Sequence, residues 1–110
     1  MSDTKNSLES WVVGQLQNGI DPLARRTRGS GCGNEISDVS NKYLYIECKM
    51  RHGNENIIMK FKEDWQHLLF RLPMKTNKIP IFVTENKYGN KFVTLKAEDF
   101  FTLLKEAKNG

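Results

Sequence analysis

The sequence contains no long apolar run, since no stretch approaches the roughly 18 consecutive apolar residues that a membrane-spanning helix requires. Its N-terminus also lacks a basic segment followed by an apolar one, which is the pattern of a secretory signal. We therefore expect a cytoplasmic protein with no membrane partner. At 110 residues we expect a single domain, residues 1–110, with an ordered core over about residues 7–107.

Cysteine and histidine are scarce, with two of each in the chain. Two cysteines do not form a disulfide framework. Cys48 lies on the apolar face of a predicted strand, which indicates a small buried side chain. His52 and His67 lie too far apart for a zinc site or for a catalytic pair with a cysteine. The glycine-rich phosphate-binding loop of the nucleoside triphosphatases is also missing, so no ATP-driven step is expected.

Basic residues outnumber acidic ones, 17 to 13, which gives a formal net charge of +4. Their distribution is more informative than their number. Arg25, Arg26 and Arg28 gather just before a run of glycines, and between residues 71 and 96 the only acid is Glu85. Such clustering favours a nucleic-acid partner over an evenly solvated surface.

The spacing of apolar residues predicts three helices. The first begins at the N-cap Ser7 and ends near Asn18, where a glycine follows. The second covers residues 63–72 and is ended by Pro73, and the third is an amphipathic closing helix over residues 97–107.

Alternating apolar and polar residues predict the strands. Two strands lie within residues 35–50 and are joined by a turn at residues 40–41, and a later hairpin has its turn at residues 86–90. Residues 57–61 are either a further short strand or the approach to a helix. The expected order is α-β-β-β-α-β-β-α, which predicts an α/β domain with a mixed central sheet flanked by helices.

The strand that ends at residue 50 has two unlike faces. Period two gives an apolar face of Leu44, Ile46, Cys48 and Met50 and a polar face of Tyr43, Tyr45, Glu47, Lys49 and Arg51. The neighbouring acid and amine, Glu47 and Lys49, are either part of a solvated face or the start of an active site. The two tyrosines could line a DNA-binding cleft, but we expect them to pack against the first helix.

Glu9 is the least expected residue of the first helix. At about 100° per residue it points between Val12 and Leu16, inside the apolar sector. A carboxylate that faces a core is costly unless it is paired or bound to a cation. Two interpretations stay open: a functional acid, or a partly exposed glutamate at the rim of the helix. We expect Trp11 and Trp65 in the core.

A pair of acids completes the candidate site. Asp38 and Glu47 can occupy neighbouring strands, which brings both carboxylates to one end of the sheet. A divalent cation relieves their repulsion, and Mg²⁺ needs few protein ligands because it keeps several waters. Lys49, on the face of Glu47, is then placed to orient an attacking water or to stabilise the transition state of phosphodiester hydrolysis.

The stretch SGCGNEISDVSNKYLYIECKMR, residues 30–51, resembles the core motif of the PD-(D/E)XK nucleases. Asp38 stands as the first acid and residues 47–49 as the (D/E)XK tripeptide, while Ser37 replaces the proline of the family name. Over roughly residues 8–104 the chain is similar, more narrowly, to the small Holliday junction resolvases of archaea and bacteriophages.

This resemblance implies a restriction-endonuclease-like fold and a set of site residues. The implied catalytic residues are Glu9, Ser30, Asp38, Glu47, Lys49 and Gln66. The implied ligands of Mg²⁺ or Mn²⁺ are Asp38, Glu47, Glu9 and the backbone carbonyl of Cys48. The residues expected to contact DNA phosphates are Arg25, Arg26, Arg28, Arg51, His52, Lys60 and Lys62.

The leading functional hypothesis is a Mg²⁺-dependent, structure-selective DNA endonuclease, a Holliday junction resolvase that makes paired nicks in four-way junctions during recombination. A viral protein of this kind would act in the host-cell cytoplasm. Because such a junction is two-fold symmetric, a homodimer is expected, with Phe82, Phe92, Phe100 and Phe101 as candidates for its interface. The alternatives are a branch- or duplex-cutting phage or restriction-like nuclease, and a catalytically idle DNA-binding module.

Overall fold

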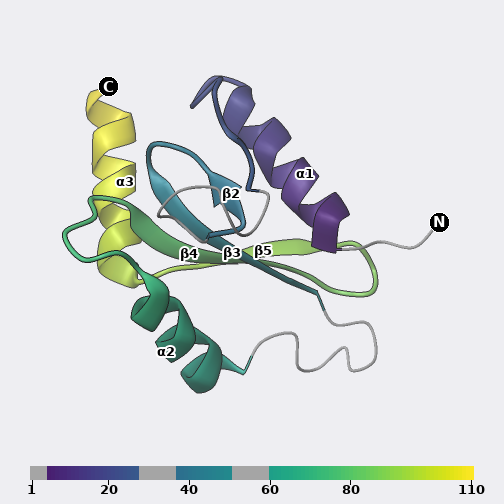
Figure 1. Ribbon diagram of the computed structural model, residues 1–110. Helices are drawn as coiled ribbons and strands as arrows, with labels where there is room; N and C mark the ends of the chain where they lie inside the picture. The colour runs from purple at the N-terminus through teal and green to yellow at the C-terminus, as the bar shows by residue number, and fades with distance from the viewer. Residues whose placement is uncertain (1–4, 28–36, 51–59) are drawn as a thin grey trace.

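The structure, a computed structural model, describes residues 5–27, 37–50 and 60–110 (Figure 1). The helices in this part of the chain are α1 (Lys5–Gln17), α2 (Phe61–Arg71) and α3 (Ala97–Asn109). The strands are β1 (Arg25–Arg26), β2 (Val39–Ser40), β3 (Leu44–Met50), β4 (Ile79–Glu85) and β5 (Lys91–Thr94). No helix among the described residues combines the length and the apolar content that a membrane span requires.

The strands form one mixed sheet of five in the order β1-β2-β3-β4-β5. Neighbouring strands are antiparallel except for β3 and β4, which run parallel from the pair Leu44–Ile79 to the pair Met50–Glu85. Since parallel neighbours need a crossover, α2 lies in the connection between them. The predicted α/β class and mixed central sheet are confirmed.

The element order agrees with the prediction, and β2 and β3 lie within residues 35–50 as expected. The first strand differs, because the pair Arg25–Arg26 was not predicted as a strand. Of the ambiguous residues 57–61, residues 57–59 lie outside the described residues, and Phe61 is the first residue of α2.

Helix α1 covers one face of the sheet and contributes most of the apolar core (Figure 1). Leu8, Val12 and Leu16 of α1 are buried against Ile46 and Cys48 of β3. Cys48 is thus the buried hydrophobic residue that its position in the alternation predicted. The helix begins at Lys5 rather than after Ser7, so Ser7 is not the N-cap.

Helix α2 covers the opposite face of the sheet, where Tyr45, Leu68 and Phe82 form a second buried cluster (Figure 1). The Tyr45 hydroxyl donates a hydrogen bond of 3.2 Å to the carbonyl of Arg71. The expectation that Tyr45 and Tyr43 pack against the first helix is therefore wrong, because the polar face of β3 is turned towards α2 and Tyr43 is 48% exposed.

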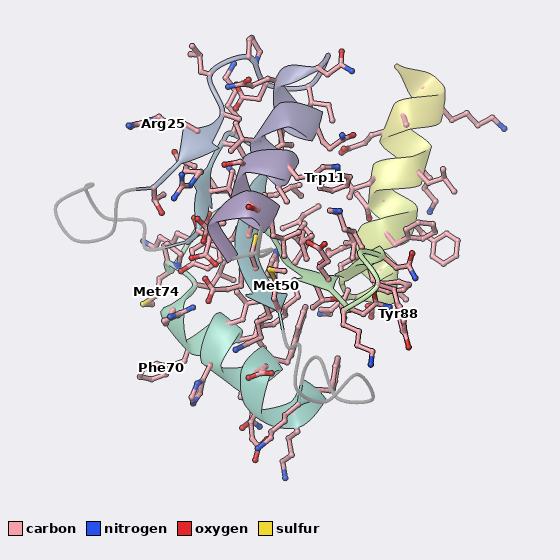
Figure 2. All side chains as sticks on the ribbon, turned by 90° about the vertical axis from the view of Figure 1, so that its right-hand side faces the viewer. Trp11, Arg25, Met50, Phe70, Met74 and Tyr88 are labelled. Atoms are coloured by element: carbon pink, nitrogen blue, oxygen red, sulfur yellow. The ribbon has the colours of Figure 1, made fainter. Side chains whose placement is uncertain are left out.

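Two aromatic residues are placed differently from their predictions. Trp11 is 43% exposed, and Figure 2 shows it on the side of α1 that faces α3. There the ammonium group of Lys91 lies 5.1 Å from the centre of the Trp11 ring, an arrangement that suits an amphipathic ring at a surface. Phe82 is only 1% exposed, so it belongs to the core and is not available to an interface.

A buried carboxylate fastens the end of α1 to the sheet. Asp21 is 2% exposed, and its two oxygens accept hydrogen bonds from the backbone N–H groups of Leu23 (3.0 Å) and Lys42 (2.9 Å). The second bond reaches the connection between β2 and β3, so Asp21 joins segments that are far apart in the sequence. It thereby helps to set how α1 lies on the strands that carry the candidate site.

Replacing Asp21 with alanine should lower the free energy of unfolding by about 3 kcal/mol, because two partly buried backbone hydrogen bonds lose their charged acceptor. Urea denaturation of the variant and the wild type measures this difference. The exposed acid Glu98 of α3 provides the matched control, and Glu98→Ala should change stability by less than about 0.5 kcal/mol. Equal stability of Asp21→Ala and the wild type would contradict the anchoring role.

Candidate active site

The candidate site is centred on the second half of β3, which is paired on both edges and covered on both faces. Because side chains alternate along a strand, Glu47 and Lys49 point to the same face as Tyr45, towards α2. Glu47 is only 9% exposed. A carboxylate with so little access to water requires charged or hydrogen-bonding partners.

Asp38 comes directly before β2 and is hydrogen-bonded to β3. The backbone N–H of Asp38 donates a hydrogen bond to the carbonyl of Ile46 (2.8 Å). The backbone N–H of Cys48 donates to the side chain of Asp38, at Oδ2 (2.8 Å). The carboxylate of Asp38 therefore lies against the peptide bond that links Glu47 to Cys48. The side chain of Asp38 is in this way placed beside the backbone of Glu47, its predicted partner.

Helix α2 supplies the ionic partners of the other two motif residues. Arg71 donates a hydrogen bond from Nη2 to Oε2 of Glu47 and forms a salt bridge with it. Asp64 lies with Oδ1 3.6 Å from Nζ of Lys49, and its other oxygen accepts the backbone N–H of Lys60 (2.8 Å). Each charged residue of the β3 face thus has a partner of opposite charge on α2.

The sequence analysis missed Arg71 and Asp64 as members of the site. Neither was predicted as a site residue, because their partners on β3 are distant in the sequence. A signal was present, because Asp64, Leu68 and Arg71 follow helical spacing, and Leu68 is the buried residue of α2. Charges on the buried side of a helix are a reason to look for counter-charges on the sheet beneath it.

Glu9 lies on the other side of the sheet, within α1, and is 7% exposed. Its Oε1 is 3.3 Å from Nε of Arg26 in β1, with which it forms a hydrogen bond and a salt bridge. The prediction that Glu9 points into the apolar sector of α1 is confirmed. The structure brings it to Arg26, whereas Glu47 is turned towards α2.

The expected DNA-contacting residues that the structure describes lie on β1 and at the start of α2. Arg25 is exposed and projects away from β1 (Figure 2), and Lys60 and Lys62 are exposed at the N-terminus of α2. A cavity of about 390 Å³ lies between α1 and β1 and is lined by Ser10, Val13, Gln17, Arg25 and Arg26. Ser10 and Gln17 are polar groups of this cavity that the sequence analysis did not single out.

Several expected site residues are not placed at the motif. Ser30, Arg28, Arg51 and His52 lie outside the described residues. Gln66 is exposed on α2 and comes two residues before the buried Leu68, which puts it on roughly the opposite side of the helix. The structure therefore does not bring Gln66 to Glu47 or Lys49.

Within residues 5–27, 37–50 and 60–110, no three side chains of Asp, Glu, His or Cys gather into a metal-binding cluster. The oxygen donors near the Glu47–Cys48 peptide are the carboxylate of Asp38, the carboxylate of Glu47 and backbone carbonyls. These are hard ligands of the type that Mg²⁺ takes, and Mg²⁺ commonly uses one or two carboxylates and fills its remaining positions with water. The donor set fits a hydrated Mg²⁺ or Mn²⁺ if Glu47 exchanges Arg71 for the ion.

No protein-family model matches this chain, and no curated protein sequence or solved structure matches it significantly. A function must therefore be inferred from the residues of the chain itself.

Replacing Asp38 with alanine should remove the acceptor of the Cys48 N–H group. We expect faster hydrogen exchange at the Cys48 amide and a loss of stability of about 2 kcal/mol, since an N–H within the sheet is left without its bond. Amide exchange measured by NMR tests this, with Glu63→Ala at the exposed start of α2 as the control. Unchanged protection of the Cys48 amide in Asp38→Ala would show that the bond is not formed.

Proposed function

We propose that this chain is a metal-dependent DNA endonuclease of the PD-(D/E)XK type, and that its substrate is a four-way DNA junction that it resolves with paired nicks. The observation that carries this proposal is the contact between the Asp38 carboxylate and the Cys48 N–H, the middle residue of the Glu47-Cys48-Lys49 tripeptide. This hydrogen bond joins the first acid of the motif, directly before β2, to the tripeptide on β3.

The topology supports the same proposal. Three antiparallel strands, a helical crossover and a parallel fourth strand, preceded by a helix, are the arrangement expected of a restriction-endonuclease-like core. Position within the sheet matters for the chemistry as well. Glu47 lies on β3, and Asp38, which comes directly before β2, is held to β3 by its hydrogen bonds with Ile46 and Cys48.

The residues have distinct roles in this proposal. Asp38, Glu47 and the carbonyl of Cys48 would hold Mg²⁺ or Mn²⁺, which supplies Lewis-acid activation of the scissile phosphate and of a water. Lys49 donates hydrogen bonds to the attacking water or to the phosphate oxygens on which charge develops. Asp64 keeps the ammonium group of Lys49 at a defined place on the α2 side of the sheet.

DNA binding is assigned to the cations at the periphery of the site. Arg25 is exposed and lines the cavity between α1 and β1 together with Ser10. In this proposal its guanidinium group and the Ser10 hydroxyl bind a phosphate of the DNA backbone. Lys60 and Lys62 provide a second group of cations near Lys49. Contacts of this kind give affinity without reading bases, which suits an enzyme that recognises DNA shape.

The proposed homodimer forms through α3 and β5. Among the described side chains none of α3 is buried, and its Phe100, Phe101 and Leu104 are each about half exposed. The neighbouring residues Phe92 and Val93 of β5 are also exposed. A helix of 13 residues is marginally stable without packing, so a second copy of the chain is the partner that stabilises it.

Cleavage of a labelled four-way junction tests the activity. With Mg²⁺ the wild type should make paired nicks in the junction and leave a linear duplex of the same sequence intact, and EDTA should stop the reaction. Lys49→Ala should slow cleavage by about 100-fold or more, and Glu47→Ala should abolish it. Lys105→Ala, an exposed lysine of α3, is the matched control and should cleave normally.

Equal cutting of junction and duplex would keep the nuclease and remove the preference for junctions. Cutting of a linear duplex at one sequence would identify a restriction-like nuclease instead. Binding of junctions without cutting in Mg²⁺ and Mn²⁺ would identify a catalytically idle module. One observation favours that second candidate: Glu9, Glu47 and Lys49 each form a salt bridge within the protein, as structural residues do.

Sedimentation tests the dimer. The wild type should sediment as a dimer at micromolar concentration, and Phe100→Ser should shift it to monomer because the apolar surface of α3 is interrupted. Phe70, which is 90% exposed at the end of α2, gives the control variant Phe70→Ser, expected to stay dimeric. A wild type that is monomeric at these concentrations would contradict the proposed interface.

A further inference from the structure

Helix α2 presents to β3 a charge pattern that complements the motif. The acid Glu47 on the strand is paired with Arg71 on the helix. The base Lys49 on the strand is paired with the acid Asp64 on the helix. Asp64 and Arg71 are two helical turns apart, which places both on the side of α2 that carries the buried Leu68. The strand residues in these pairs, Glu47 and Lys49, are the ones on which the proposed metal binding and catalysis depend.

We propose that Arg71 is the counter-ion of Glu47 in the metal-free protein and passes to a DNA phosphate when a divalent cation takes that carboxylate. The inference rests on the proposed nuclease function and adds Arg71 to its site as a positioning residue. Metal binding must then displace the salt bridge between Arg71 and Glu47, since Arg71 and the cation compete for the same carboxylate.

The geometry of Arg71 suits this exchange. Its side chain is 39% exposed, whereas that of Glu47 is 11% exposed, so the guanidinium group joins a nearly buried acid to the solvent side where DNA would lie. A guanidinium group binds carboxylate and phosphate oxygens with the same fork of donors. Arg71 is therefore paired both in the metal-free protein and in the complex with metal and DNA.

The backbone of α2 need not move for this exchange. The Tyr45 hydroxyl holds the carbonyl of Arg71, and Leu68 is fully buried against the sheet. Because both contacts are independent of the guanidinium group, only the side chain of Arg71 has to rotate. The same contacts keep Asp64, and with it Lys49, in position while Arg71 changes partner.

Calorimetric titration of the full chain with Mn²⁺ tests the competition without requiring activity. Arg71→Gln should bind Mn²⁺ about tenfold more tightly than the wild type, because the ion no longer displaces a salt bridge. Arg71→Lys keeps a charge without the fork and should lie between the two. Lys75→Gln is the matched control, since it removes one positive charge from an exposed position shortly after α2.

Junction binding tests the second half of the exchange. In Ca²⁺, which occupies oxygen sites, Arg71→Gln should bind a four-way junction several-fold more weakly than the wild type. In EDTA, where Arg71 stays on Glu47, the variant and the wild type should bind equally.

The outcomes separate this inference from the proposed function. Unchanged Mn²⁺ affinity in Arg71→Gln, alongside loss of Mn²⁺ binding in Glu47→Gln, would overturn the role of Arg71 and leave the metal site intact. Equal tightening in Lys75→Gln would overturn it as well, since the effect would then be one of general charge. No Mn²⁺ binding by the wild type or by any variant would overturn the proposed nuclease together with the inference.

Discussion

The enclosure of β3 is the constraint on which the rest of the structure depends. This strand is hydrogen-bonded to β2 on one edge and to β4 on the other, and α1 and α2 cover its two faces. A strand enclosed in this way is ordinarily apolar on both faces. Here one face carries Glu47 and Lys49, and the helix above it supplies the opposite charges. The burial of an ionic pair thus links the architecture of the sheet to the chemistry of the site.

Much of the fold follows from local periodicity. The alternation in residues 44–50 correctly separates Ile46 and Cys48 from Tyr45 and Glu47, and the turn at residues 86–90 lies where Gly89 adopts a φ of 87°. Glycine suits that position because other residues are strained there. Periodicity assigns residues to faces, but it does not say which helix covers a face. That is why Tyr45 was assigned to the first helix when it packs against α2.

The partners of the site residues are the part that the sequence could not supply. Asp38 and Glu47 were predicted together because their strands are neighbours in the chain. The salt bridges of Glu47 with Arg71 and of Glu9 with Arg26 join residues from elements that only tertiary packing brings together. Trp11 shows the same limit, since its place on an apolar helix face predicted burial, whereas its ring is 43% exposed beside Lys91 of β5.

The parallel pairing of β3 with β4 also has a kinetic consequence. It joins residues as distant as Leu44 and Ile79, and the intervening chain includes α2. Closing such a long loop is entropically costly and slows folding. Arg71 and Asp64 reach Glu47 and Lys49 only once α2 has docked, so the charges of β3 stay solvated until then. Since Phe82 of β4 belongs to the cluster against which α2 packs, a nascent chain that ends before β4 lacks part of the surface on which the site is assembled.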